Sequence, residues 1–138
     1  MSVRLYLLYT EKPDERVLRK IIPKLPSSSQ EKVFKNHSLK EQWRATLSDL
    51  LLRNVLAQEL DVSPTSIEIE INSHGKPFLN EEKRYFNLSH SEAIIVIATD
   101  NTPIGIDVEY IQPLDDLEHL LVNFSHEEQQ AYQARAPE

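Results

Sequence analysis

The sequence contains no cysteine, only two glycines and no long apolar run. The absence of cysteine excludes disulfides, zinc-thiolate sites and a cysteine nucleophile, and it is typical of proteins in a reducing cytosol. No apolar stretch approaches the ~20 residues that a membrane-spanning helix needs, and residues 1–8 do not resemble a signal peptide. We therefore expect a cytoplasmic protein without a membrane partner.

Positive charge is also scarce. Lysine and arginine total 15 against 22 acidic residues, which gives a net charge of -7. General nucleic-acid binding needs a basic face that displaces counterions, so we expect no nucleic-acid partner. The length of 138 residues suits one domain with a core of its own.

Hydrophobic periodicity predicts an α+β fold with a mostly antiparallel sheet packed against one long helix. Four segments have the composition or alternation of strands: residues 3–9, 67–71, 93–99 and 104–109. Four segments have helical spacing or capping signals: residues 14–22, 38–60, 115–122 and 125–134. We expect a loop at residues 27–29, and a hairpin that joins residues 93–99 to residues 104–109.

The segment 104–109 carries the sharpest chemical feature. In a strand, Gly105, Asp107 and Glu109 would share one face, opposite a row of β-branched residues. Neighbouring carboxylates repel unless solvent or a cation separates them, and Mg²⁺ favours one or two carboxylates with water and phosphate oxygens. Gly105 would leave room for a diphosphate. A plain amphipathic strand with a solvated acidic face is the alternative, and the pattern leaves both open.

A basic turn precedes this segment. Gly75 and Pro77 flank Lys76, and exposed N–H groups beside an ammonium can hold a phosphate. An ordinary turn with a solvated lysine is the alternative, and by itself this motif favours it.

Residues 86–91 place Ser89 and His90 before an apolar strand. The cluster either binds phosphate, acts in proton transfer or caps backbone groups. Adjacent strand residues point to opposite faces, so Ser89 and His90 are not a catalytic dyad. Arg44 on the long helix and Lys32 before it either reach a phosphate or are solvated.

Several motifs follow one another along the chain: H-G-K-P-F-L, F-N-L-S-H-S, P-I-G-I-D-V-E-Y and F-S-H-E-E. In this order, and with the helix around Trp43, they resemble the Sfp-type 4'-phosphopantetheinyl transferases of the holo-acyl-carrier-protein synthase superfamily. The resemblance implies one half of a pseudo-twofold fold. It also implies an enzyme that moves the phosphopantetheine arm of coenzyme A onto a serine of an apo acyl or peptidyl carrier protein.

The resemblance further implies roles for individual residues. Asp107 and Glu109 would be the Mg²⁺ ligands and, with His90, the catalytic residues. The residues that bind coenzyme A would be Lys32, Arg44, Gly75, Lys76, Pro77, Ser89 and His90. Glu128 matches the acidic position of the F-S-x-x-E stretch. The carrier serine would attack the β-phosphate of coenzyme A and release 3',5'-ADP.

One family motif, W-x-x-K-E, is missing after F-S-x-x-E, and the single tryptophan is Trp43. We therefore expect residues 1–138 to form the N-terminal portion of a transferase domain whose second half is truncated or absent. A face left open in this way favours a homodimer. The alternatives are a catalytically incomplete half-domain that binds coenzyme A and Mg²⁺ and needs a partner, and an α+β interaction domain with a solvated acidic strand.

Overall fold

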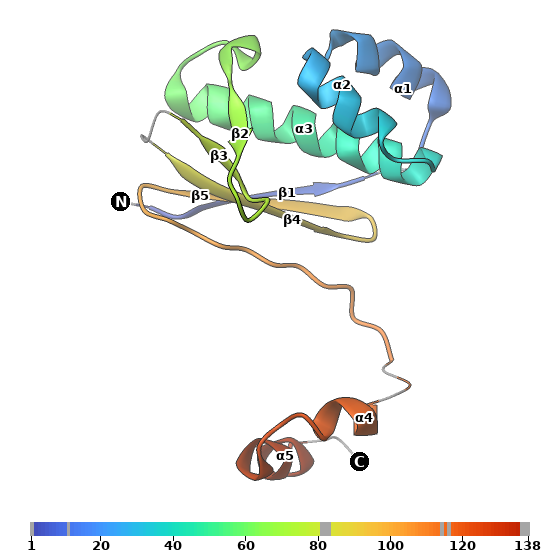
Figure 1. Cartoon of the computed structure of the whole chain (residues 1–138), viewed down its shortest axis with the longest axis vertical. Helices are drawn as coiled ribbons and strands as arrows, with labels where there is room; N and C mark the ends of the chain where they lie inside the picture. Colours follow the sequence, from blue (N-terminus) through green and yellow to red (C-terminus); the bar gives the residue numbers. More distant parts are fainter. Residues whose placement is uncertain (1, 11, 81–83, 114, 116, 136–138) are drawn as a thin grey trace.

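The computed structural model describes residues 2–10, 12–80, 84–113, 115 and 117–135. Its strands are β1 (Arg4–Tyr9), β2 (Ile69–Ile71), β3 (Pro77–Leu79), β4 (Tyr85–Ser91) and β5 (Ile94–Asp100). Its α-helices are α1 (Glu15–Ile21), α2 (Ser27–Phe34), α3 (Leu39–Leu60), α4 (Leu117–Leu121) and α5 (His126–Gln133). Short 3₁₀ turns occupy Ile22–Lys24 and Pro64–Ser66. The predicted α+β class is confirmed (Figure 1).

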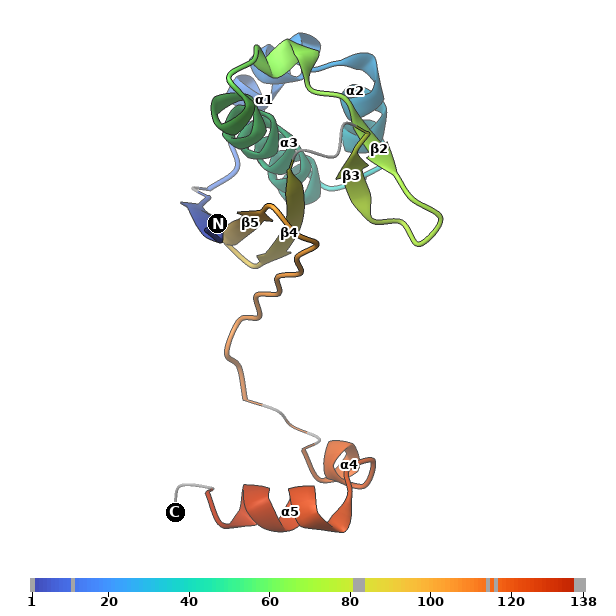
Figure 2. The ribbon, with the colours of Figure 1, turned by 90° about the vertical axis from the view of Figure 1, so that its left-hand side faces the viewer.

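Three strands form the main sheet, in the order β1-β5-β4, and both pairings are antiparallel. A separate antiparallel hairpin joins β2 to β3. Helix α3 lies along one face of the main sheet, which we call the helix face. The chain after β5 runs below the opposite face, which we call the open face, before it leads away to α4 and α5 (Figures 1 and 2).

The core has two parts, and α3 contributes to both. Between α3 and the helix face, Leu52, Val55 and Leu56 pack with Phe86 and Ile97. A second cluster packs α1 and α2 against the first half of α3; its buried members are Leu18, Ile22, Leu25, Val33 and Trp43. The long predicted helix is therefore the element around which the described residues are organised.

Local signals set the ends of α3. The Ser38 hydroxyl accepts a hydrogen bond from the Glu41 N–H, which satisfies one of the free donors of the first turn. Asp61 ends the helix in the left-handed region, with φ of 55°. Among the described residues, no helix combines the length and the apolar character that crossing a membrane requires.

The expected loop at residues 27–29 is wrong, because these residues begin α2. Serine is compatible with a helix start, and Ser29 gains a buried position there. The Ser29 hydroxyl donates to Asp49 on α3, and the Arg53 guanidinium donates to both Ser29 and Asp49. Contacts with α3 therefore stabilise a helix where the run of serines alone had indicated a loop.

The expected hairpin between residues 93–99 and 104–109 is also wrong. Strand β5 is already paired with β1 on one side and β4 on the other, so it has no free edge. The strands that the sequence analysis did not identify, β3 and β4, lie in the turn-rich stretch before β5. Residues 104–109 are extended but form no strand.

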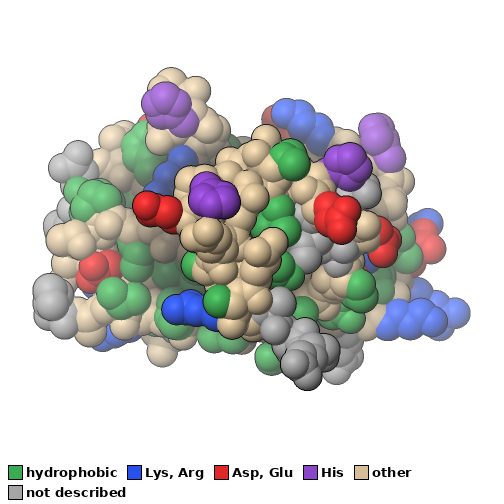
Figure 3. Space-filling model, turned by 90° about the horizontal axis from the view of Figure 1, so that it is seen from below, with side chains coloured by type: hydrophobic (Ala, Val, Ile, Leu, Met, Phe, Trp, Pro, Cys, Tyr) green, Lys and Arg blue, Asp and Glu red, His purple; other side chains and the backbone are tan. Residues whose placement is uncertain are grey.

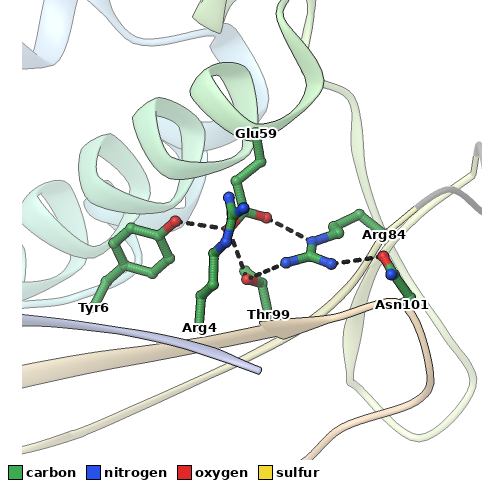
Figure 4. A network of polar contacts seen from close by, with 6 residues as sticks. All are labelled: Arg4, Tyr6, Glu59, Arg84, Thr99 and Asn101. Atoms are coloured by element: carbon green, nitrogen blue, oxygen red, sulfur yellow. Dashed lines mark hydrogen bonds and ion pairs between the residues drawn. The ribbon is translucent and has the colours of Figure 1, made fainter. Parts of the chain in front are cut away.

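A buried polar network fixes one end of the sheet to α3 (Figure 4). The Glu59 carboxylate accepts hydrogen bonds from Tyr6, Thr99 and the Arg84 guanidinium, and its Oε1 lies 3.6 Å from Arg4 Nη1. Burial alone would raise the pKa of Glu59, but the hydrogen bonds from Arg84, Tyr6 and Thr99 together outweigh burial and lower it. Arg84 also donates to Asn101, where the chain leaves β5.

Candidate functional site

The acidic segment 104–110 is held against β4 by side chains. The β4 polar row consists of Asn87, Ser89 and Ser91, which alternate along the strand and share the open face. The Ile106 N–H donates to Asn87 Oδ1 at 2.8 Å, the Val108 N–H to Ser89 Oγ at 3.2 Å and the Tyr110 N–H to Ser91 Oγ at 2.8 Å. The segment therefore runs parallel to β4 across the open face.

This arrangement confirms the predicted alternation of side chains without a strand. Ile104, Ile106 and Val108 are half-buried, while Asp107 and Glu109 are exposed. Asp107 Oδ1 accepts hydrogen bonds from Ser89 Oγ and from the Val108 N–H, each at 3.0 Å. The row therefore orients one of the two predicted metal ligands directly.

The donor set of the acidic segment fits Mg²⁺. Asp107 Oδ2 takes part in no hydrogen bond among the described residues, and Glu109 is exposed on the same side of the segment. Two carboxylates with open positions suit an ion that keeps water and phosphate oxygens as further ligands. Within the described part of the chain, however, no three acidic or histidine side chains gather around one point. Any ion held here has at most these two protein ligands from the described residues.

The predicted basic turn is present, and it joins β2 to β3, a strand that was not predicted. Gly75 adopts φ of +81°, a conformation that glycine tolerates best, and Asn72 bonds the turn internally. The Lys76 ammonium donates to the Ile104 carbonyl oxygen at 2.8 Å. Lys76 and Pro77 also line a pocket of about 160 Å³ together with Ile104. The turn thus meets the first residue of the acidic segment.

His90 and Arg44 lie close enough to interact, on the helix side of the sheet. Partial burial lowers the pKa of His90, and the positive charge of Arg44 lowers it further. A pocket of about 360 Å³ opens beside Arg44, and its lining includes Lys12, Lys40, Trp43 and Glu92, whose carboxylate forms an ion pair with Lys40 at 3.3 Å. An aromatic ring with the cations Arg44 and Lys12 suits a nucleotide that carries a phosphate, whereas Lys40 already has a carboxylate partner.

Two other predicted residues stand apart from these groups. Lys32 is exposed on α2, and no described contact joins its side chain to Arg44 or His90. Glu128 forms the predicted capping box with Ser125 at the start of α5, and these hydrogen bonds lower its pKa.

Seen from below, the surface of the described residues shows lysine and arginine side chains in separate places rather than in one patch (Figure 3).

The sequence analysis missed Asn87 and Ser91 as site residues, as well as Lys12 and Lys40. The sequence did contain a signal for Asn87 and Ser91: they alternate with Ser89, and polar residues at every second position of a strand share one face. Lys12 and Lys40 are separated by 28 positions of chain and carried no such signal. A larger pocket of about 470 Å³, between Leu60 and Leu79, holds none of the predicted site residues.

Comparison with known proteins identifies the family of this chain. Residues 11–102 match the family described as 4'-phosphopantetheinyl transferase, N-terminal. That match includes Arg44, Lys76 and His90, and it ends before Asp107. The chain belongs to the 4'-phosphopantetheinyl transferase family, and its relatives are of the Sfp type.

Three relatives illustrate the similarity. The chain is 30% identical to 4'-phosphopantetheinyl transferase gsp of Aneurinibacillus migulanus, over 83% of this chain and 48% of the relative. It is 28% identical to 4'-phosphopantetheinyl transferase Sfp of Bacillus subtilis (strain 168), over 81% and 51%. It is 32% identical to 4'-phosphopantetheinyl transferase HetI of Nostoc sp., over 89% and 54%. The chain thus spans about half the length of the curated relatives it matches.

Proposed function

We propose that this chain takes part in the Mg²⁺-dependent transfer of the 4'-phosphopantetheine group from coenzyme A to a serine of an apo acyl or peptidyl carrier protein. The observation that carries the proposal is the placement of Ser89 and His90. The two residues are consecutive in β4 and therefore point to opposite faces of the sheet. Ser89 donates a hydrogen bond to Asp107 on the open face, whereas His90 lies on the helix face, within reach of the charge of Arg44. One strand thus lies between the proposed metal ligands and a cationic group.

Coenzyme A has the complementary chemistry. Coenzyme A carries a diphosphate and, elsewhere on the molecule, a 3'-phosphate. It therefore needs two separate phosphate-binding groups. Arg44 and His90 suit the 3'-phosphate, and Lys32, which stands apart from them on α2, would have to reach the same phosphate through solvent. Asp107 and Glu109 would hold the Mg²⁺ ion, which when bound offsets the charge of the diphosphate.

The two glycines support contact with a ligand at both places. A Cβ atom added at Gly105 would lie 4.0 Å from Asn87 Oδ1, an ordinary contact, so packing within the described residues does not require glycine there. The space beside the carboxylates suits the approach of a diphosphate. Around Gly75, nothing lies within 4 Å of an added Cβ, so a ligand could approach the turn there, and the Lys76 ammonium would then exchange the Ile104 carbonyl oxygen for a phosphate.

In this proposal, the residues of the chain act by positioning and electrostatics. The cations orient the nucleotide, and the carboxylates fix the diphosphate through the ion. The oxygen of the carrier serine bonds to the β-phosphorus while the bond from that phosphorus to 3',5'-ADP breaks, and the hydroxyl proton of the serine is released to solvent. His90 lies in the cationic group, where it contacts the nucleotide rather than the attacking serine.

Isothermal titration with coenzyme A, with and without Mg²⁺, tests the proposal. We expect coenzyme A to bind more tightly when Mg²⁺ is present. Asp107→Asn should weaken this binding only in the presence of Mg²⁺, whereas Arg44→Ala should weaken it in both conditions, by about tenfold or more. Glu127→Gln, an exposed change on α5, is the matched control. Absence of binding by the unaltered chain would refute the proposal. Loading of an apo carrier protein, read as a mass gain of ~340 Da, tests transfer itself.

A second candidate is a half-domain that binds coenzyme A and Mg²⁺ and becomes active only with a partner, such as a second copy of this chain. The exposed apolar residues of the edge strand and its start favour it: Val3, Leu5, Leu7 and Tyr9 are each more than half exposed on the open face. Light scattering at increasing concentration should reveal a dimer that Leu7→Glu disrupts and Lys35→Glu does not. A monomer at all concentrations contradicts the homodimer.

A further inference from the structure

The acidic segment lies against the sheet without the backbone ladder that normally holds an extended chain. Every second N–H group, at residues 106, 108 and 110, instead donates to a side chain of the β4 polar row. Backbone N–H groups that are shielded from water need acceptors, and here Asn87, Ser89 and Ser91 provide them.

The spacing of this contact selects one register. Side chains of β4 recur on the open face every two residues, and so do the N–H groups of an extended chain that face the sheet. A slip by one residue would turn Asp107 and Glu109 toward the sheet and turn the half-buried apolar side chains outward. The row therefore determines which side of the segment the carboxylates occupy.

The ends of the segment are fixed separately from its middle. Lys76 bonds the Ile104 carbonyl oxygen at the beginning, and Ser91 accepts from the Tyr110 N–H at the end. Within the β4 polar row, Ser89 donates a hydrogen bond to a carboxylate, that of Asp107. Asn87 and Ser91 accept hydrogen bonds from backbone N–H groups of the segment, so their effect on the carboxylates operates through the position of the segment.

We propose that Asn87 and Ser91 are positioning residues that set the register of the acidic segment and thereby direct Asp107 and Glu109 to the exposed side. The inference about register concerns this chain alone; its consequence for metal binding rests on the proposed function. Neither residue contacts coenzyme A or the ion in this assignment.

Amide hydrogen exchange, followed by NMR on the whole chain without metal, tests the register directly. We expect slower exchange at Ile106, Val108 and Tyr110 than at Asp107 and Glu109. Asn87→Leu keeps the size of the side chain and removes the acceptor, so exchange at Ile106 should quicken about fivefold. Asn87→Asp keeps an acceptor oxygen and should retain protection.

Ser91 provides a second, independent pair of variants. Ser91→Ala should speed exchange at Tyr110, whereas Ser91→Thr, which keeps the hydroxyl, should not. Titration with Mn²⁺, followed by electron paramagnetic resonance, should then show weaker binding for Ser91→Ala and rescue by Ser91→Thr. Unfolding followed by Trp43 fluorescence should change little in either variant, which separates loss of register from loss of fold.

The outcomes distinguish the two proposals. Unchanged exchange at Ile106 in Asn87→Leu and at Tyr110 in Ser91→Ala overturns the register proposal, whatever the metal result. The expected exchange pattern in a chain that binds no divalent ion supports the register proposal and contradicts the proposed function. Equal loss of protection in Ser91→Thr and Ser91→Ala counts against a role for the hydroxyl.

Discussion

The two faces of the main sheet use similar polar residues for different purposes. On the helix face, Glu59 is almost fully buried, with 3% of its side chain exposed, and every described partner of its carboxylate is part of the fold. On the open face, Asp107 also has a hydroxyl and an N–H as partners, but it remains exposed. Burial therefore decides which carboxylate stabilises the fold and which is available to a ligand.

The cost of removing a carboxylate should differ accordingly. A buried ion pair that loses one partner leaves an uncompensated charge, whereas an exposed carboxylate is replaced by water at little cost. The helix face should respond in the free energy of unfolding, and the open face in ligand affinity. The following predictions test this difference.

The largest effect is expected for Glu59→Ala. The change removes the carboxylate that pairs with the Arg84 guanidinium, whose side chain is 10% exposed. The buried positive charge then has no acidic partner, and the free energy of unfolding should fall by about 3–5 kcal/mol. Denaturant unfolding measures it. The control Glu31→Gln, exposed on α2, should stay within about 0.5 kcal/mol. A loss for Glu59→Ala no larger than that of the control would show that the network does not stabilise the fold.

The same carboxylate should make the chain sensitive to acid. The pKa of Glu59 in the folded chain lies below its ordinary value of 4.5, so its contribution is complete above that pH and is lost as the pH falls through the folded pKa. Unfolding free energies measured across this range should fall more steeply for the unaltered chain than for Glu59→Gln. Parallel curves for the two proteins would contradict this assignment.

A smaller effect is expected for the pH dependence of coenzyme A binding. His90 has a lowered pKa in the free chain, and a bound phosphate should raise it, so binding takes up a proton. Affinity should therefore rise as the pH falls from about 8 toward about 6, by at most about tenfold per pH unit. Titration of His90→Gln should give a flatter profile, and an unchanged profile would separate His90 from the phosphate.

The smallest effects concern the two glycines. Gly75→Ala must adopt a positive φ, which should cost about 1 kcal/mol in stability. Gly105→Ala meets no close contact, so its unfolding free energy should stay close to that of the unaltered chain. Its affinity for coenzyme A with Mg²⁺ should nevertheless fall if a diphosphate approaches there. Thermal unfolding and titration of both variants make the comparison, and equal stability losses would contradict it.

Sequence patterns were sufficient to predict those elements in which local periodicity and tertiary packing favour the same secondary structure. The long helix at residues 38–60, the first strand and the capping box at Ser125 and Glu128 were predicted and are present. The alternation of residues 104–109 was also predicted, because it depends only on an extended backbone. The metal-ligand and coenzyme A assignments stay predictions.

The partners of these segments could not be read from the chain. Whether β5 would pair with residues 104–109 depended on β1, which occupies one edge of β5 from the far end of the sequence. The helix at Ser27–Phe34 depended on the buried contacts of Ser29 and Arg53, which join residues 24 positions apart.

The sequence by itself determined which residues alternate and which cap helices, because these properties arise from neighbours along the chain. Only the tertiary structure decided that the acidic segment lies on the β4 polar row and that His90 lies near Arg44. Those contacts bring together residues distant in sequence, and their free energy comes from burial and hydrogen bonds that exist only in the folded chain.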